Sequence, residues 1–348
     1  MRALPRNTVL VGDVRERLAE LPDASVDCVI TSPPFFQLRD YGVAGQLGLE
    51  PTVDEWVDEL RVIMRGVARV LKPTGSLWLN LGDSYSRHAR FGAPPKSLLL
   101  APERLALALV ADGWTLRNKV IWSKSNGMPN SVQDRLSCRW EVVYFFTRQR
   151  QYVFDLGGIR IPHRSATTRR PLSKPNIKAV PAQSKPPTWA GPLAGNNSGL
   201  ARLKKQGLVG HPLGKNPGDV WTMAASNYRG PHFATFPLAL VERPLLATCP
   251  ERVCTGCGAP WIRVKVPRHD AVAQRGELHP GCRCRKGWQP GLVLDPFMGT
   301  GTVGIVAEQH EREWLGVELN PKFAALANER IAGARNQRST DQGRRRAA

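Results

Sequence analysis

Two short segments of the sequence combine residue types that could bind a nucleoside and activate an amino group. The first, residues 292–302 (LVLDPFMGTGT), is a buried strand, a turn with two glycines and a helix beginning near Thr302. Glycines let the backbone approach a ligand with no Cβ in the way. Glu318 ends the next strand, seventeen residues beyond Gly301, where a carboxylate can accept hydrogen bonds from ribose hydroxyls. This order predicts a nucleoside-containing cofactor, and the missing third glycine and P-loop lysine disfavour NAD and ATP.

The second segment, residues 27–35 (DCVITSPPF), is a buried strand that ends in a hydroxyl group, two prolines and an aromatic ring. Prolines fix φ and lack an N–H, so neighbouring carbonyls are left as unpaired acceptors. Together with Ser32, these carbonyls could accept both protons of an exocyclic amino group while Phe35 stacks on the base. The alternative interpretation is an ordinary strand exit with a proline turn.

A third group of reactive residues consists of cysteines. Cys254 and Cys257 form a C-x-x-C pair, Cys282 and Cys284 form a C-x-C pair, and four thiolates at such spacings can close a structural zinc site. A site with four protein ligands has no open position, so it would be structural rather than catalytic. Substitute ligands would be Cys249, His269 and His279, and the alternative is reduced cysteines in a loop. Seven unevenly spread cysteines do not suit a secreted disulfide framework and indicate an intracellular chain.

Hydrophobic patterning predicts the elements that position these groups. Strand signals alternate with helical ones, which implies an α/β fold with a doubly wound, mostly parallel sheet covered by helices on both faces. The predicted strands are 9–11, 26–31, 76–81, 119–122, 142–146, 291–294 and 314–317, and the predicted helices include 53–70, 102–112 and 237–246.

Composition favours a polyanionic partner. The 348 residues carry a net charge of +20, and nucleic acid is the commonest partner of so basic a chain, although a merely soluble basic enzyme is the alternative. No run approaches the roughly 20 apolar residues of a membrane helix. The segment 156–218 contains no Asp or Glu and eleven Lys and Arg, so it is either a disordered basic linker or a loop-rich segment that lies along phosphates.

These patterns divide the chain into a series of segments. The predicted domains are 1–155 (catalytic half), 156–218 (basic target-recognition insert), 219–248 with 289–334 (cofactor-binding half), 249–288 (zinc knuckle) and 335–348 (disordered basic tail).

The two motifs together resemble those of the DNA amino-methyltransferases, which use S-adenosylmethionine. The Ser-Pro-Pro-Phe motif precedes the glycine motif, with a long variable region between them, and this order is similar to that of the β group of the family. Residues 11–13, 71–78 and 232–237 also resemble family segments. Neither Cys28 nor Cys138 follows a proline, which disfavours methylation of cytosine carbon 5.

The resemblance implies a role for each matching residue. Ser32, Pro33, Pro34 and Phe35 would grip a base flipped out of duplex DNA. The basic insert would contact DNA through Arg169, Arg170, Lys204 and Lys205. The S-adenosylmethionine site would comprise Asp13, Phe233, Thr235, Asp295, Phe297, Gly299, Gly301, Thr302 and Glu318.

The resemblance also implies a substrate and partners. Ser at the first motif position and Phe35 favour cytosine N4 over adenine N6. The partner would be double-stranded DNA in a bacterial or phage-type cytoplasm at the nucleoid, with a restriction endonuclease acting on the same site. The rivals are methylation of RNA by the same apparatus and a non-catalytic, zinc-containing nucleic-acid-binding protein.

Overall fold

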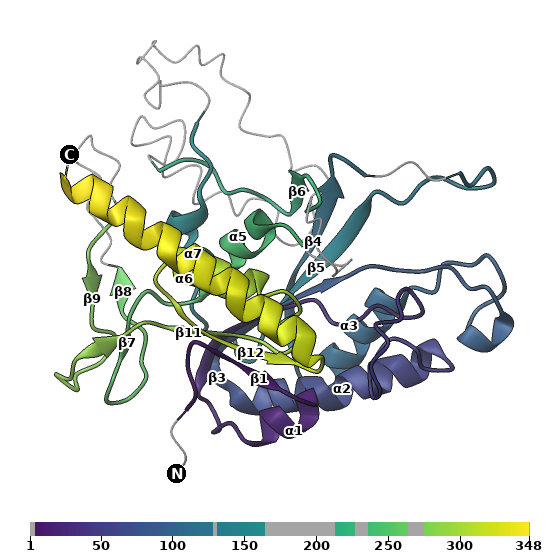
Figure 1. Ribbon diagram of the computed structural model, residues 1–348, viewed down its shortest axis with the longest axis horizontal. Coiled ribbons are helices and arrows are strands. Elements are labelled where there is room, and N and C mark those ends of the chain that lie inside the picture. Colours follow the sequence, from purple (N-terminus) through teal and green to yellow (C-terminus); the bar gives the residue numbers. More distant parts are fainter. Residues whose placement is uncertain (1–3, 128–130, 164–212, 227–235, 264–274, 348) are drawn as a thin grey trace, which may run out of the picture. The chain divides into compact units, whose positions relative to one another are not determined.

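An eight-stranded sheet forms the centre of the structure, a computed structural model that describes residues 4–127, 131–163, 213–226, 236–263 and 275–347 (Figure 1). The strand order is β1-β12-β11-β2-β3-β5-β4-β6. Strand β5 runs antiparallel to both neighbours, and the other adjacent pairs are parallel. The strands are β1 (Thr8–Val11), β2 (Val26–Thr31), β3 (Leu71–Leu81), β4 (Thr115–Lys124), β5 (Trp140–Thr147), β6 (Val220–Met223), β11 (Leu292–Asp295) and β12 (Glu313–Glu318).

Helices cover both faces of this sheet. Side chains alternate across a strand, so Val29 and Leu77 face one apolar cluster while Cys28 and Trp78 face the other. The first cluster is completed by α1 (Val14–Ala19), α2 (Val53–Val70) and α3 (Ala101–Ala111), and the second by α5 (Leu238–Thr248), α6 (Thr302–Gln309) and α7 (Pro321–Ala347). The predicted doubly wound, mostly parallel sheet is therefore confirmed.

Local sequence explains why α2, the best-defined helix of the first layer, begins where it does. The Thr52 hydroxyl accepts from the Glu55 N–H at 3.2 Å, and the Glu55 carboxylate accepts from the Thr52 N–H at 3.0 Å, which is a capping box. Trp56, Leu60 and Met64 recur at helical spacing and are fully buried. Helix α2 therefore packs against β3 and between α1 and α3.

Contacts divide the chain into two units. One comprises Met1–Asp155, Gly218–Ile262 and Leu278–Ala348 and holds the sheet, while the other comprises Leu156–Pro217 and Arg263–Glu277. In the second unit the structure describes a short 3₁₀ turn, η2 (Leu156–Ile159), and a bridge between Ile161 and Lys215. Two short strand pairs lie outside the main sheet: β7 (Val253–Cys254) with β10 (Trp288–Gln289), and β8 (Ile262–Arg263) with β9 (Leu278–His279).

The expected disordered tail at 335–348 is wrong, because helix α7 continues to Ala347. The guanidinium of Arg335 pairs with Glu308, and that of Arg338 pairs with Glu311. These two ion pairs connect α7 to the end of α6 and to the turn that follows it. Within the described segments, no helix has the length and apolar character needed to cross a bilayer.

Candidate active site

A cavity of about 530 Å³ opens at the carboxyl edge of the sheet. Both sequence motifs contribute to its lining, together with the ends of β4 and β5. The position follows from the topology: β2 continues through α2 to one side of the sheet, whereas β11 continues through α6 to the other. The point where connections diverge in this way leaves a crevice beyond the strand ends, where α/β proteins bind ligands.

The glycine turn after β11 is fastened to the end of β12. The Gly299 N–H donates to Oε2 of Glu318 at 2.8 Å, and the Asn320 N–H donates to Oε1 of the same carboxylate at 2.8 Å. Burial raises the pKa of Glu318 above its ordinary value. Glu318 therefore lines the cavity as a carboxylate fixed by two backbone donors, with its remaining lone pairs available to a ligand.

The two glycines of this turn, Gly299 and Gly301, have different surroundings. Both adopt positive φ, at 51° for Gly299 and 80° for Gly301. Gly299 lines the cavity, as predicted from sequence, but Gly301 does not. A Cβ at Gly301 would come within 3.1 Å of the Ala327 side chain and 3.0 Å of Ile331 on α7. The second glycine therefore permits close packing of α6 against α7.

Asp295 joins the two motifs. Its Oδ1 accepts from the Thr31 hydroxyl at 2.7 Å and from the Phe297 N–H at 3.0 Å. Burial raises the pKa of Asp295 to about 7, and its Oδ2 has no hydrogen-bond partner among the described residues. Asp295 lies behind the cavity wall rather than in the lining, while the adjacent Pro296 and Phe297 face the cavity.

A polar network fixes the hydroxyl of Ser32. The Ser32 Oγ donates to Oδ1 of Asn80 at 3.0 Å. The Asn80 Nδ2 donates in turn to Glu141 Oε2 and to the Val142 carbonyl, each at 3.1 Å. Lys124 forms an ion pair with the other oxygen of Glu141. Since the Ser32 proton is committed to Asn80, the hydroxyl lone pairs remain as acceptors.

The sequence analysis missed Asn80, Glu141 and Lys124, all of which line the cavity. Asn80 carried a usable signal, because it is the one amide in the apolar strand end 77–81. Glu141 and Lys124 carried no such signal, because charged residues are common at the ends of strands. Only the pairing of β5 between β3 and β4 brings them to Ser32.

The remaining residues of the Ser-Pro-Pro-Phe motif are held by α2 and β3. The indole Nε1 of Trp56 donates to the Pro34 carbonyl at 3.0 Å, so Ser32 and the Pro33 carbonyl remain as candidate acceptors. A Cβ at Gly82 would lie 2.7 Å from the Phe35 ring, so this glycine makes room for the ring. All four motif residues line the cavity.

The other predicted cofactor residues have different outcomes. Asp13 and Thr302 line the cavity. The Asp13 carboxylate caps α1 by accepting from the Arg15 N–H at 2.7 Å, and it also pairs with the Arg15 guanidinium at 3.0 Å. The predicted residues outside the described ranges are Phe233 and Thr235 of the cofactor site and Arg169, Arg170, Lys204 and Lys205 of the basic segment.

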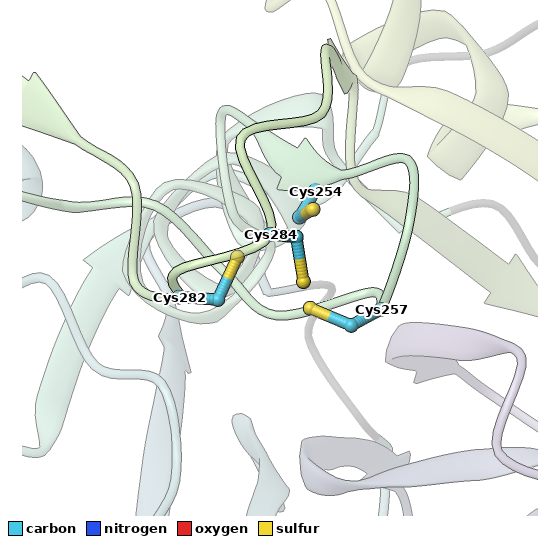
Figure 2. Close-up of side chains that lie close together, drawn as sticks. All are labelled: Cys254, Cys257, Cys282 and Cys284. Carbon is cyan, nitrogen blue, oxygen red and sulfur yellow. The ribbon is translucent and has the colours of Figure 1, made fainter.

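The four predicted zinc ligands come together. The sulfur atoms of Cys254, Cys257, Cys282 and Cys284 lie within 4.8 Å of one another, and Figure 2 shows the side chains converging from two loops. Backbone N–H groups of Cys257 and Gly256 lower the pKa of the Cys254 thiol to about 7. Four convergent thiols with a low-pKa member are chemically suited to tetrahedral zinc.

The cysteine cluster does not line the cavity. Strand β10 leads directly into the start of β11, so the cluster lies at the amino edge of the sheet. Lys72, at the start of β3, confirms this position, because its Nζ donates to the Gly258 carbonyl at 3.4 Å. Nearly the whole length of β3 separates Lys72 from Asn80 at the cavity.

Comparison with known proteins shows that the chain matches one protein family and is similar to members of one class of enzyme. Residues 26–329 match the family described as DNA methylase, N6_N4_Mtase. The type II methyltransferase M.SmaI of Serratia marcescens is 32% identical, covering 93% of this chain and 90% of that protein. M.XycI of Xanthomonas campestris pv. cyanopsidis is 31% identical, covering 94% and 88%.

One solved structure shares the fold over nearly the whole chain. The cytosine-N4-specific PvuII DNA methyltransferase superposes with a TM-score of 0.55 at 19% identity, covering 96% of this chain and 93% of that one. At this level of identity the similarity concerns the fold.

Proposed function

Because the chain belongs to the DNA methylase family, as a β-group amino-methyltransferase, we propose that it methylates the N4 amino group of cytosine in duplex DNA. The methyl donor is S-adenosylmethionine, which supplies an electrophilic methyl group on a sulfonium. The target base leaves the duplex and enters the cavity, since an amino group inside a base pair cannot be reached.

The observation that carries this proposal is the fixed orientation of the Ser32 hydroxyl. Its proton goes to Asn80 at 3.0 Å, so the oxygen presents only lone pairs to the cavity. An exocyclic amino nitrogen is a poor nucleophile because its lone pair is delocalised into the ring. Acceptance of its hydrogens by Ser32 and the Pro33 carbonyl localises that pair and aims it at the methyl group.

The base assignment rests on the motif itself. The acceptor here is a neutral hydroxyl followed by two prolines and Phe35, the combination that favours cytosine over adenine. The Ser32 hydroxyl is hydrogen-bonded to the amide of Asn80, and the Glu141 carboxylate is one hydrogen bond further along and paired with Lys124. Adenine N6 is the alternative outcome of the test below.

The cavity fits the methyl donor in size and in chemistry. A volume of about 530 Å³ is within the range of small-molecule sites. Glu318 offers acceptors for ribose hydroxyls, and the Phe297 side chain offers an apolar wall. The buried carboxyl group of Asp295, whose pKa burial raises to about 7, precedes the lining residues Pro296 and Phe297.

The test is analysis of DNA from cells that express the protein. Hydrolysed DNA should contain N4-methylcytosine, and modification-sensitive sequencing should place it in one short sequence context. Cells that express a Ser32→Ala variant are the control for background methylation. Detection of N6-methyladenine instead would overturn the base assignment and retain the enzyme class, whereas unmodified DNA from cells with soluble protein would overturn the proposed activity.

The DNA partner is engaged by the basic segment 156–218. Eleven positive and no negative side chains suit phosphate contacts, including those assigned to Arg169, Arg170, Lys204 and Lys205. M.SmaI and M.XycI carry type II methyltransferase names, and we extend that role to this chain. It would act at the nucleoid, in a bacterial or phage-type cytoplasm, beside an endonuclease of the same specificity.

The four-cysteine cluster is proposed to bind one structural zinc ion. Cys254 and Cys257 belong to one segment and Cys282 and Cys284 to another, so a metal would add a further link between two segments that the short β7–β10 and β8–β9 pairs also connect. Binding energy of this kind adds directly to folding free energy.

Purified protein should contain close to one zinc ion per chain. Cys257→Ser should remove the metal and lower the thermal midpoint, because three thiolates hold zinc less tightly. Cys138→Ser is the matched control, since Cys138 is an exposed thiol away from the cluster. Elemental analysis of reduced protein checks the metal content, and a metal-free preparation with parental stability would contradict the assignment.

A further inference from the structure

We propose that Leu136 is a wedge that occupies the gap left in the DNA duplex when the target base moves into the cavity. The inference rests on the proposed function, because only an enzyme that extrudes a base must stabilise the vacated position. Proteins that open or kink DNA commonly insert apolar side chains between base steps. Leu136 is an exposed apolar side chain, and it lies two residues from Cys138, which lines the cavity.

The position follows from the loop between β4 and β5, of which residues 125–127 and 131–139 are described, and the latter extend beyond the strand ends (Figure 1). Asn126 and Gly127 on one arm of this loop and Cys138 on the other line the cavity. Leu136 is only two residues from Cys138. A flipped base stays attached to its strand, so the duplex must lie across this rim while the base is inside.

The exposure of Leu136 is extreme. Its side chain is 90% exposed, the highest value among the large apolar side chains of the described residues, and Leu107 follows at 71%. Single exposed apolar residues are common on protein surfaces. Leu136 differs because it is two residues from Cys138, which lines a cavity that would receive a base, and an unstacked base step there would offer it an apolar partner.

The neighbours of Leu136 hold the loop in place. The Arg135 guanidinium lies over the Tyr85 ring, 3.6 Å from its centroid, and Asp134 pairs with Lys96 at 2.7 Å. Both partners belong to the segment between β3 and α3. The exposed ion pair adds little by itself, but the stacked arginine adds a geometric restraint. The two residues before Leu136 are thus anchored while its own side chain projects into solvent.

The base of the same loop is closed by Arg139. Its Nη2 donates to the Ser125 carbonyl at 3.3 Å, and its own carbonyl accepts from the Lys124 N–H at 2.9 Å. A Cβ at Gly127 would lie 3.0 Å from the Arg139 Nε, so the two arms are closely apposed. A side chain that enters the duplex binds at a lower entropic cost if its loop is already ordered, and these contacts order the loop.

The test compares two short duplexes that carry the methylation site mapped by sequencing. In one the target base is normally paired, and in the other it faces an abasic site and is already partly free. Under single-turnover conditions Leu136→Ala should slow methylation of the paired duplex by about 10-fold, and of the abasic duplex by less than about 2-fold. Leu136→Met keeps apolar bulk and should retain most of the rate on both duplexes.

The matched control is Leu107→Ala on α3, which removes an exposed leucine away from the cavity and should leave both rates unchanged. A parental rate of Leu136→Ala on the paired duplex would overturn the wedge, and so would an equal loss on both duplexes, which indicates a general defect. Failure of the proposed function would look different, because the parental protein would then methylate neither duplex.

Discussion

Replacement of Ser32 by alanine should slow methyl transfer by about 10²- to 10³-fold, the usual cost of one lost hydrogen-bond contact to the reacting group in the transition state. The hydroxyl is fixed by Asn80 with its lone pairs free, so the variant loses an acceptor that alanine cannot replace. Affinity for S-adenosylmethionine should be nearly unchanged, since the proposed partner of Ser32 is the target base and not the donor. Single-turnover rates and calorimetry measure the two quantities separately.

Two further variants sharpen this experiment. Ser25→Ala removes a hydroxyl that bonds the Pro22 carbonyl, just before β2 and far from the cavity, and it should leave the rate unchanged. Asn80→Ala frees the Ser32 proton, so the hydroxyl can rotate and the rate should fall, although less than in Ser32→Ala. An unchanged methylation rate in Ser32→Ala would remove Ser32 from the mechanism.

Replacement of Glu318 by alanine should weaken S-adenosylmethionine binding by about 1.5 to 3 kcal/mol, or roughly 10- to 100-fold in Kd. Two ribose hydroxyls lose a charged acceptor. The Gly299 and Asn320 N–H groups also lose their shared acceptor, so the glycine turn is no longer fastened to β12. Isothermal calorimetry with the purified protein measures the change directly.

The binding loss must be separated from a loss of folding. Glu329→Ala removes an exposed carboxylate from α7 and is the matched control, with parental affinity expected. Thermal unfolding without the donor shows whether Glu318→Ala is folded at the temperature of the titration. A folded Glu318→Ala protein with parental affinity would contradict the proposal that Glu318 binds the ribose hydroxyls. Glu318 would then serve only as the acceptor for the Gly299 and Asn320 N–H groups.

The sequence by itself determined the parts of this protein that local patterns encode. Hydrophobic patterning located the strands of the main sheet other than β6, together with helices α2, α3 and α5, and both motifs lie at strand ends, as expected. Parallel strands place their carboxyl ends at one edge, and Ser32 and Glu318, which follow or end two such strands, both line the cavity there. The four cysteines converge as their spacing predicted.

The tertiary structure decided which other groups join that cavity. Asn80, Glu141 and Lys124 meet because β5 inserts antiparallel between β3 and β4, an order that burial of both sheet faces selects and that no local spacing reveals. The same non-local packing turns Gly301 toward α7, places the cysteine cluster at the opposite edge and continues α7 past Arg335. Residue types fix which chemistry is available, but sheet order and helix packing fix which groups act together.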